Sequence, residues 1–274
     1  MTLNFYKYQG TGNDFIVIDN TRSSYFPDEK THTEEIALLC NRHLGIGADG
    51  LILLNPSEKY DFHMRYFNAD GKEGSMCGNG GRCAVAFAKM LGIIGQETIF
   101  SAIDGTHKAR IIASNNNQTI ISLQLNDAPA PDAYEDHLIV NTGSPHLVIF
   151  TEEVTQVAVT TEGRRIRNSE DFETNGINVN FAEVLNNESL LVRTYERGVE
   201  NETLSCGTGV TASALAAWSK NIRNLGNMYN IKTLGGSLKV SFSPPEKENT
   251  PFKDIWLTGP AEFVFKGEIV VSAS

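Results

Sequence analysis

The chain has 274 residues, of which 41% are hydrophobic and 20% are charged, and its formal net charge is −10. This length suits one large domain or two small ones, and the apolar content excludes disorder, collagen and coiled coil as the main state. An acidic chain repels phosphate backbones and anionic surfaces, so we expect neither a nucleic acid nor a membrane as a partner.

Alternating apolar and polar residues predict many short strands along the chain, among them residues 62–67, 119–125 and 190–195. The helix predicted after Cys77 is apolar on nearly all sides and ends at Gly92, which indicates a buried helix. Residues 262–271 are predicted to form a further hairpin that returns to the first half of the chain.

The chain repeats itself at a spacing of about 130 residues. Both Cys77 and Cys206 begin a Cys-Gly-x-Gly motif followed by a helix of small residues, and they lie 129 positions apart. A second similarity lies upstream, where Thr11–Phe15 matches Thr142–His146 at an offset of 131 residues. Two pairs of similar segments at nearly the same offset predict two similarly folded halves that arose by duplication.

We therefore predict an α/β (α+β) fold of two similar lobes, each a curved mixed or antiparallel sheet wrapped around a central helix. The predicted N-terminal lobe is 1–115 and carries Cys77, and the C-terminal strands 262–274 return to it. The predicted C-terminal lobe is 116–261 and carries Cys206. The boundary is placed in the polar stretch 114–118.

The chain has four cysteines and no C-x-x-C pair, so neither a metal site nor a thioredoxin-type site is predicted. The chain starts without a basic stretch before an apolar run, and no segment reaches the ~20 apolar residues that span a bilayer. We expect a cytoplasmic protein with reduced thiols. Cys40 and Cys83 have apolar neighbours at helical spacing and are interpreted as packing residues.

Each Cys-Gly-x-Gly motif places a thiol at the start of a helix. The first N–H groups of a helix lack internal partners and bind carboxylates or phosphates, and a thiolate at that position is stabilised. One thiol on each face of a carbon suits stereoinversion at an acidic C–H, in which a thiolate removes the proton and a thiol returns one. No phosphate-cradling glycine loop or Schiff-base lysine context is evident, so no cofactor is predicted.

The sequence resembles the diaminopimelate epimerases, cofactor-independent two-thiol enzymes of lysine and cell-wall precursor synthesis. Seven blocks carry the resemblance in order: Thr11–Phe15, Gly45–Gly50, Phe67–Gly71, Cys77–Gly80, Gly143–His146, Glu196–Gly198 and Cys206–Gly209. They span most of the chain. The resemblance implies an isomerase that interconverts L,L- and meso-2,6-diaminopimelate, a diamino-diacid, and that forms a homodimer.

The resemblance also implies roles for individual residues. Cys77 and Cys206 match the two acid/base thiols, with His146 as the polar partner of Cys77 and Glu196 as that of Cys206. The cradle for the reacting carboxylate matches Gly78, Asn79, Gly207 and Thr208. The positions that hold the rest of the substrate are Asn13, Asn68, Asn178, Glu196 and Arg197. Two positions depart from the family pattern: Ser144 stands where many members have Asn, and Gly50 where some have Gln.

Alternative functions remain open at this point. Proline racemases and hydroxyproline epimerases resemble the chain more distantly, but their first motif typically reads Cys-Gly-His-Gly where this chain has Asn79, and their substrate gives Arg197 no partner. A non-catalytic anion-binding or thiol-redox protein is a further alternative, and a cysteine hydrolase leaves the second thiol unexplained.

Two groups of polar residues are given structural interpretations. Asp14, Asp49 and Asp70 are interpreted as caps of turns or helices. The remaining histidines have no evident partner in the sequence and are interpreted as surface or structural residues: His32, His43, His63, His107 and His137.

Overall fold

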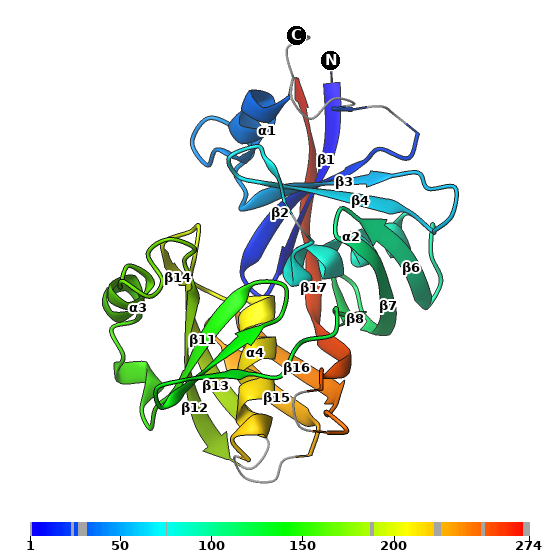
Figure 1. Ribbon diagram of the computed structural model, residues 1–274. Coiled ribbons are helices and arrows are strands. Elements are labelled where there is room, and N and C mark those ends of the chain that lie inside the picture. Colours follow the sequence, from blue (N-terminus) through cyan, green and yellow to red (C-terminus); the bar gives the residue numbers. More distant parts are fainter. Residues whose placement is uncertain are drawn as a thin grey trace. The chain divides into compact units, whose positions relative to one another are not determined.

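The computed structural model describes residues 2–22, 25–26, 32–74, 76–186, 189–221, 226–247 and 250–270 (Figure 1). The chain forms two compact units. The first comprises the chain up to Leu123 together with the residues from Gly259 onward, and the second is Gln124–Thr258. The polar stretch 114–118, where the sequence suggested a boundary, forms the turn of a hairpin inside the first unit, because its flanking strands pair from Ala109 to Leu123.

The described residues of the first unit form a mixed sheet with two helices. Its elements are β1 (Thr2–Gly10), β2 (Asn13–Asp19), α1 (Thr33–Cys40), β3 (Gly50–Asn55), β4 (His63–Asn68), β5 (Glu73–Gly74), α2 (Gly78–Met90), β6 (Glu97–Ala102), β7 (Gly105–Ser114) and β8 (Gln118–Gln124). Strands β2–β3 and β4–β6 pair in parallel, and β1–β2, β3–β4, β6–β7 and β7–β8 are antiparallel. Helix α2 packs against β1 to β4.

The second unit repeats this order of pairings. Its elements are β9 (Asp132–Tyr134), β10 (His137–Asn141), β11 (Pro145–Phe150), η1 (Val154–Gln156), α3 (Val159–Arg167), β12 (Asn178–Asn186), β13 (Ser189–Glu196), β14 (Asn201–Thr203), α4 (Gly207–Ser219), β15 (Met228–Thr233) and β16 (Gly236–Ser243). Strands β11–β12 and β13–β15 pair in parallel, and β10–β11, β12–β13 and β15–β16 are antiparallel. Helix α4 packs against β10 to β13, β15 and β16 (Figure 1).

Individual contacts also recur in the two units, which confirms the predicted duplication. In the first unit the guanidinium of Arg65 on β4 forms an ion pair with Glu73 on β5 at 3.2 Å. In the second, Arg193 on β13 forms an ion pair with Glu202 on β14 at 2.7 Å. The strand order and these ion pairs therefore match at an offset of about 130 residues.

The helix predicted after Cys77 is confirmed as the buried helix α2. Its last turn closes on Gly92, whose φ of 75° is the left-handed conformation that glycine adopts most readily. The N–H of Gly92 donates to the Lys89 carbonyl and that of Ile93 to the Ala88 carbonyl, both at 3.0 Å, which is a Schellman cap. The central residues of α2 from Cys83 to Ala88 are at most 5% exposed.

Helix α4 is the corresponding buried helix of the second unit. Two of its buried hydroxyls, those of Thr211 and Ser213, donate to the carbonyls four residues earlier at 2.9 and 2.8 Å. These bonds satisfy hydroxyls that otherwise lie among apolar side chains, including Val210, Leu215 and Phe242.

The prediction of a hairpin over residues 262–271 is wrong. Lys253–Val270 is one continuous strand, β17, which begins in the second unit against β16 and ends in the first unit against β1. Gly267 does not form a turn because it stays in register opposite Phe5, and a Cβ at this glycine would lie 2.8 Å from the Phe5 ring. Residues 271–274 lie outside the described residues.

Candidate active site

The first predicted thiol, Cys77, is the residue that immediately precedes α2. Its backbone is extended, with φ −85° and ψ 131°, while its carbonyl already accepts the N–H of Gly81 at 2.7 Å. This is the N-cap position, and the helix has no acidic residue in its first turn. The N–H groups of Gly78 and Asn79 therefore belong to the end of the helix that attracts anions.

Asn79 is held in one orientation by a buried cation. Arg82 is fully buried and donates to the Asn79 Oδ1 at 2.9 Å, to the Gly78 carbonyl at 3.2 Å and to the Pro260 carbonyl at 3.2 Å. Burial lowers the pKa of Arg82 to about 10, so the guanidinium still carries its charge at neutral pH. With its oxygen engaged by Arg82, Asn79 presents its amide nitrogen to the Oδ1 of Asn13.

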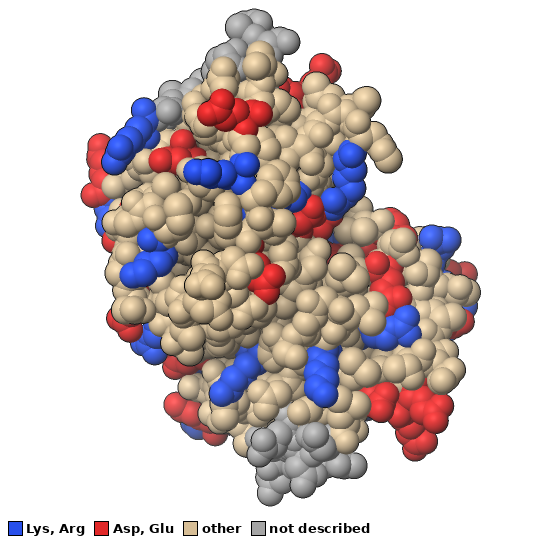
Figure 2. Space-filling model, turned by 180° about the vertical axis from the view of Figure 1, so that it is seen from behind, with Lys and Arg blue, Asp and Glu red and all other residues tan. Residues whose placement is uncertain are grey.

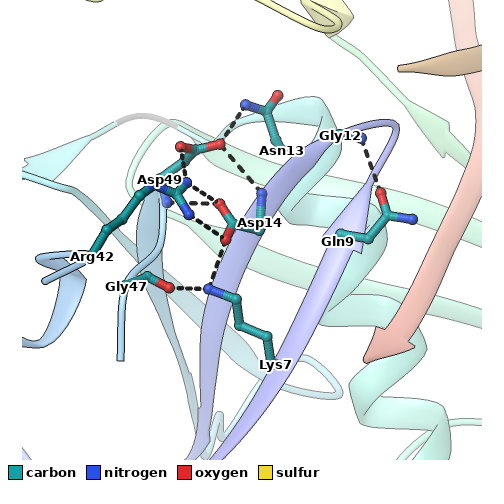
Figure 3. Close-up of polar contacts among 8 residues, drawn as sticks. All are labelled: Lys7, Gln9, Gly12, Asn13, Asp14, Arg42, Gly47 and Asp49. Carbon is teal, nitrogen blue, oxygen red and sulfur yellow. Dashed lines mark hydrogen bonds and ion pairs between the residues drawn. The ribbon is translucent and has the colours of Figure 1, made fainter. Parts of the chain in front are cut away.

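Asn13 is in turn held by a cluster of charges that the sequence did not predict (Figure 3). Its Nδ2 donates to Asp49 at 3.0 Å, and Arg42 bridges Asp49 at 2.8 Å and Asp14 at 2.6 Å. Lys7, only 6% exposed, forms an ion pair with Asp14 at 2.8 Å. Burial acts to raise the pKa of Asp14, but hydrogen bonds from Arg42 and Lys7 outweigh it and lower the pKa to about 2.

The aspartates therefore differ in their roles. The cap interpretation is confirmed for Asp70, which accepts the N–H of Lys72 at 3.0 Å. Asp14 and Asp49 also accept each other's backbone N–H, but their ion pairs with Lys7 and Arg42 give them a further part in fixing Asn13.

The second predicted thiol, Cys206, precedes α4 in the same way. Its backbone is extended, with φ −111° and ψ 114°, and its carbonyl accepts the N–H of Val210 at 2.9 Å. The Cys206 sulfur lies 3.4 Å from the Thr208 hydroxyl oxygen, and that oxygen lies 2.9 Å from Nε2 of His146. Gly207 is buried at the first position of the helix, between the thiol and Thr208.

His146 is completely buried. Burial lowers its pKa to about 3, and the positive charge of Arg197 acts in the same direction. Its ring is therefore neutral at physiological pH, and its second nitrogen, Nδ1, lies 3.0 Å from the amide nitrogen of Asn180. Asn180 is a residue of this site that the sequence analysis did not identify.

Three of the residues predicted to hold the far part of the substrate, Asn178, Glu196 and Arg197, lie at the neighbouring ends of β12 and β13, next to the start of β11. Parallel pairing sets Asn178 directly opposite His146, and the Asn178 Oδ1 accepts the N–H of Arg197 at 2.9 Å. Ser144, which departs from the family pattern, accepts from Asn178 at 2.8 Å and from Arg197 at 3.4 Å. Glu196 is the last residue of β13, directly before Arg197.

Gly50 and Asn68 are paired residues of β3 and β4 in the first unit. A Cβ at Gly50 would lie 2.6 Å from the Tyr66 ring and 2.5 Å from the Phe67 carbonyl. The Tyr66 ring thus occupies the space that a side chain at position 50 would need, which explains the glycine at this departure from the family pattern. Asn68 itself is exposed at the end of β4.

The other two cysteines are buried packing residues, as predicted. Cys40 is 3% exposed and Cys83 fully buried. Burial raises the pKa of Cys40 to about 12 and that of Cys83 well above its usual range. Neither forms a reactive thiolate at neutral pH.

The histidines outside the site include three with partners that the sequence did not reveal. His32 contacts Glu35 at 3.1 Å, His63 contacts Ser101 at 2.9 Å, and His107 contacts Asp104 at 3.1 Å. These contacts come from residues within three positions or from a neighbouring strand, so a structural role is confirmed for these three.

Within the described ranges, no helix has both the length and the apolar content to cross a membrane. No group of three or more His, Cys, Asp or Glu side chains is arranged to hold a metal ion in that part of the chain either. On the face shown in Figure 2, the basic and acidic side chains of the described residues are interspersed instead of gathered by sign.

Comparison with known proteins agrees with this arrangement. The family model described as diaminopimelate epimerase matches residues 5–123 and 138–264. Diaminopimelate epimerase of Flavobacterium psychrophilum is 49% identical over 97% of this chain and all of that protein. The enzyme of the same name from Chlorobaculum tepidum is 41% identical over 96% of this chain and 99% of that protein.

This chain belongs to the diaminopimelate epimerase family. Epimerases are isomerases, so the class of enzyme follows from family membership. Both sulfur-bearing helix starts of the family pattern, Cys77 and Cys206, lie within the matched ranges.

Solved structures outside the diaminopimelate epimerase family share the fold. A PhzF-family phenazine biosynthesis protein of Bacillus anthracis aligns over 99% of this chain and all of its own, with a TM-score of 0.75 and 16% identity. A probable proline racemase of Agrobacterium radiobacter aligns over 98% of this chain and 93% of its own, with a TM-score of 0.70 and 12% identity. The prediction of duplicated lobes built around central helices is confirmed.

Proposed function

We propose that this chain interconverts L,L- and meso-2,6-diaminopimelate in lysine and cell-wall precursor biosynthesis, with Cys77 and Cys206 as the two acid/base groups. The observation that carries the proposal is the pair of cysteines in the N-cap positions of two equivalent buried helices, in a chain whose relatives over nearly the full length are diaminopimelate epimerases.

The proposed reaction is a two-base proton transfer. The thiolate of one cysteine takes the α-proton, so that the C–H bond breaks and an S–H bond forms. The electron pair left on the α-carbon delocalises into the adjacent carboxylate. The thiol of the other cysteine then delivers its proton to the opposite face of the carbon, and the two sulfurs end with exchanged protonation states. The chemistry requires both sulfurs at a single α-carbon.

The backbone N–H groups at the starts of α2 and α4 support the proposed carbanion step. Those of Gly78, Asn79, Gly207 and Thr208 are at helix positions that lack internal acceptors, and a carboxylate gains negative charge as the proton leaves. Asn13, Asn68, Asn178, Glu196 and Arg197 are proposed to pair with the amino groups and the distal carboxylate. His146 and Glu196 are proposed as the polar groups that tune the two thiols.

Exchange of the α-hydrogen in deuterium oxide tests the proposal. With either the L,L or the meso isomer, we expect deuterium at one α-carbon and interconversion of the isomers, followed by mass spectrometry and chiral chromatography. Absence of exchange with both isomers contradicts the proposed function.

Serine variants test the roles of the thiols. We expect Cys77→Ser and Cys206→Ser each to lose activity by about 100-fold or more, because a hydroxyl is a much weaker base at neutral pH. Cys40→Ala is the matched control and should keep kcat, because Cys40 packs in the core beside Ile36 and Leu39. Full activity in Cys77→Ser would favour a non-catalytic or redox role for that thiol.

A proline-type racemase is the second candidate, favoured only by the shared fold of the probable proline racemase and of a hydroxyproline epimerase from Agrobacterium vitis. Side-by-side turnover of diaminopimelate and proline separates the two candidates. We expect no detectable proline racemisation, because Asn79 and Arg197 match a substrate with two charged ends.

We also propose a cytoplasmic location and a homodimer. A cytoplasmic location is supported by the need for two reduced thiols, which the cytosol maintains, and the homodimer rests on the family resemblance. Light scattering of the purified protein at several concentrations tests the dimer; a monomer mass throughout contradicts it.

A further inference from the structure

The second unit contains a buried row of polar side chains at positions where the first unit has aromatic or aliphatic ones. Its members are His146 on β11, Asn180 on β12 and Thr194 on β13, each at most 3% exposed. Asn180 is paired directly with Thr194, and its partner on β11 is Val148, two residues beyond His146. The same pairings in the first unit place Phe15, Ile52 and Tyr66 in the equivalent positions. Burial of polar groups is costly unless each is hydrogen-bonded, so a row present in only one half calls for a reason.

The hydrogen bonds of Asn180 fix the orientation of its amide. Its Nδ2 lies 3.2 Å from the Leu147 carbonyl, which can only accept, so this atom is the nitrogen. Its Oδ1 accepts from the Thr194 hydroxyl at 2.9 Å. The second hydrogen of the amide is then directed at Nδ1 of His146, 3.0 Å away.

This orientation fixes the tautomer of His146. A nitrogen that accepts a hydrogen bond carries no proton, so in the neutral ring the proton is on Nε2. Nε2–H donates to the Thr208 hydroxyl oxygen at 2.9 Å. Once that oxygen accepts from His146, its own hydrogen is free to turn toward the Cys206 sulfur, 3.4 Å away.

We propose that Asn180 is a positioning residue which, through the tautomer of His146 and the hydroxyl of Thr208, directs a hydrogen bond onto the Cys206 sulfur and stabilises its thiolate. This role rests on the proposed function, in which that sulfur exchanges a proton with substrate. The sequence resemblance pairs His146 with Cys77; the hydrogen bonds within the second unit connect it to Cys206.

Gly209 shows how closely the row is packed against the helix. A Cβ at this position would lie 2.3 Å from the Asn180 Oδ1. In the first unit the corresponding glycine, Gly80, has the apolar Ile52 side chain as its nearest neighbour, at 3.4 Å. Helix α4 thus approaches a polar group that the equivalent helix does not meet.

The first part of the test observes the tautomer directly. Long-range proton–nitrogen NMR of the full chain labelled with ¹⁵N-histidine distinguishes Nδ1–H from Nε2–H rings, and a His146→Gln variant assigns the signal. We expect a neutral Nε2–H ring for His146 between pH 6 and pH 8. An Nδ1–H ring or a protonated ring in this range overturns the proposal.

The second part measures thiolate formation at Cys206, from the pH dependence of its alkylation by iodoacetamide with mass spectrometry of the peptide. We expect Thr208→Val to raise the apparent pKa of Cys206 by about one unit, which is about tenfold slower alkylation at pH values below it. Thr208→Ser should restore the wild-type profile. Thr211→Val is the matched control, because its hydroxyl donates only to the Gly207 carbonyl in the same helix.

Asn180→Leu removes the donor while keeping a similar volume. We expect a mixture of His146 tautomers, slower alkylation of Cys206, and a lower kcat with KM unchanged, since Asn180 is buried behind His146. Should this variant fail to fold, the wild-type tautomer and the Thr208 pair decide the proposal. An unchanged Cys206 profile in Thr208→Val overturns it.

These readouts separate the inference from the proposed function. The tautomer and the alkylation profile are measured without substrate. If the protein shows both results but does not exchange the α-hydrogen of diaminopimelate, the role of Asn180 is supported and the proposed function is wrong. If the protein epimerises diaminopimelate but its His146 carries the proton on Nδ1, the proposed function is supported and the role of Asn180 is wrong.

Discussion

Burial and position, more than residue type, separate the proposed acid/base thiols from the packing residues in this chain. Four cysteines share one chemistry, yet Cys40 and Cys83 lie inside cores where burial raises the pKa of each thiol. Cys77 and Cys206 stand at helix starts, where the backbone dipoles favour the thiolate. The same contrast distinguishes the exposed Asp70 from Asp14, whose neighbours are two cations.

The charge cluster around Asp14 predicts an acid-sensitive contribution to stability. Its folded pKa of about 2 lies below the unfolded value of about 4, so its stabilisation is complete above pH 4 and is lost as pH falls toward 2. Because Arg42 is half exposed, we expect Asp14→Asn to lower the free energy of unfolding by only about 1–2 kcal/mol at pH 7.

Urea unfolding at pH 7 and at pH 3 measures this effect. The gap between wild type and Asp14→Asn should shrink at the lower pH. Asp70→Asn is the control, since the Asp70–Lys72 pair is exposed and should change stability by less than about 0.5 kcal/mol. An equal gap at both pH values contradicts the assignment.

At the scale of elements, the helices α2 and α4 each have 13 residues and begin in the same way, but they pack against different side chains. Each begins directly after a cysteine with an extended backbone, and each is buried among strands of its own unit. The strands beside α4 carry polar residues where those beside α2 carry apolar ones, so duplication preserved the frame while the lining diverged. A side chain added at Gly209 of α4 would therefore meet a closer neighbour than one added at Gly80 of α2.

Replacement of Gly209 by alanine tests this close approach. The new methyl group would overlap the Asn180 oxygen, so we expect Gly209→Ala to destabilise the protein by about 1–3 kcal/mol in thermal or urea unfolding. Gly95→Ala is the control, because a Cβ there meets no atom within 4 Å. Equal stability of the two variants shows that the row next to α4 tolerates displacement.

At the scale of the whole molecule, the proposed function requires the thiols of two separate units to act on one carbon. Mild oxidation is therefore expected to join Cys77 and Cys206 in a disulfide and to abolish activity, and a reductant should restore it. Peptide mapping identifies the bond and activity is followed in parallel. Oxidation that leaves both thiols free, or a Cys77–Cys206 bond without loss of activity, contradicts the required geometry.

Much of this organisation could be predicted from the sequence because the same local sequence patterns occur in both halves of the chain. The Cys-Gly-x-Gly motifs fixed both helix starts, and Gly92 fixed the end of α2, since caps and left-handed glycines act over a few neighbouring residues. The alternating patterns located the strands at 63–68, 118–124 and 189–196 to within a residue or two.

Only the tertiary structure decided which distant side chains meet. The hairpin expected at the C-terminus is a single strand because pairing with β1 overrides the local preference of Gly267. The hydrogen bond from Asn13 to Asp49 joins residues that are 36 positions apart. The contact of Asn180 with His146 joins residues that are 34 positions apart. Strand register brings both pairs together. Local patterns determine elements because they depend on adjacent backbone, whereas hydrogen-bond partners across a sheet depend on register, which is set by the packing of the whole unit.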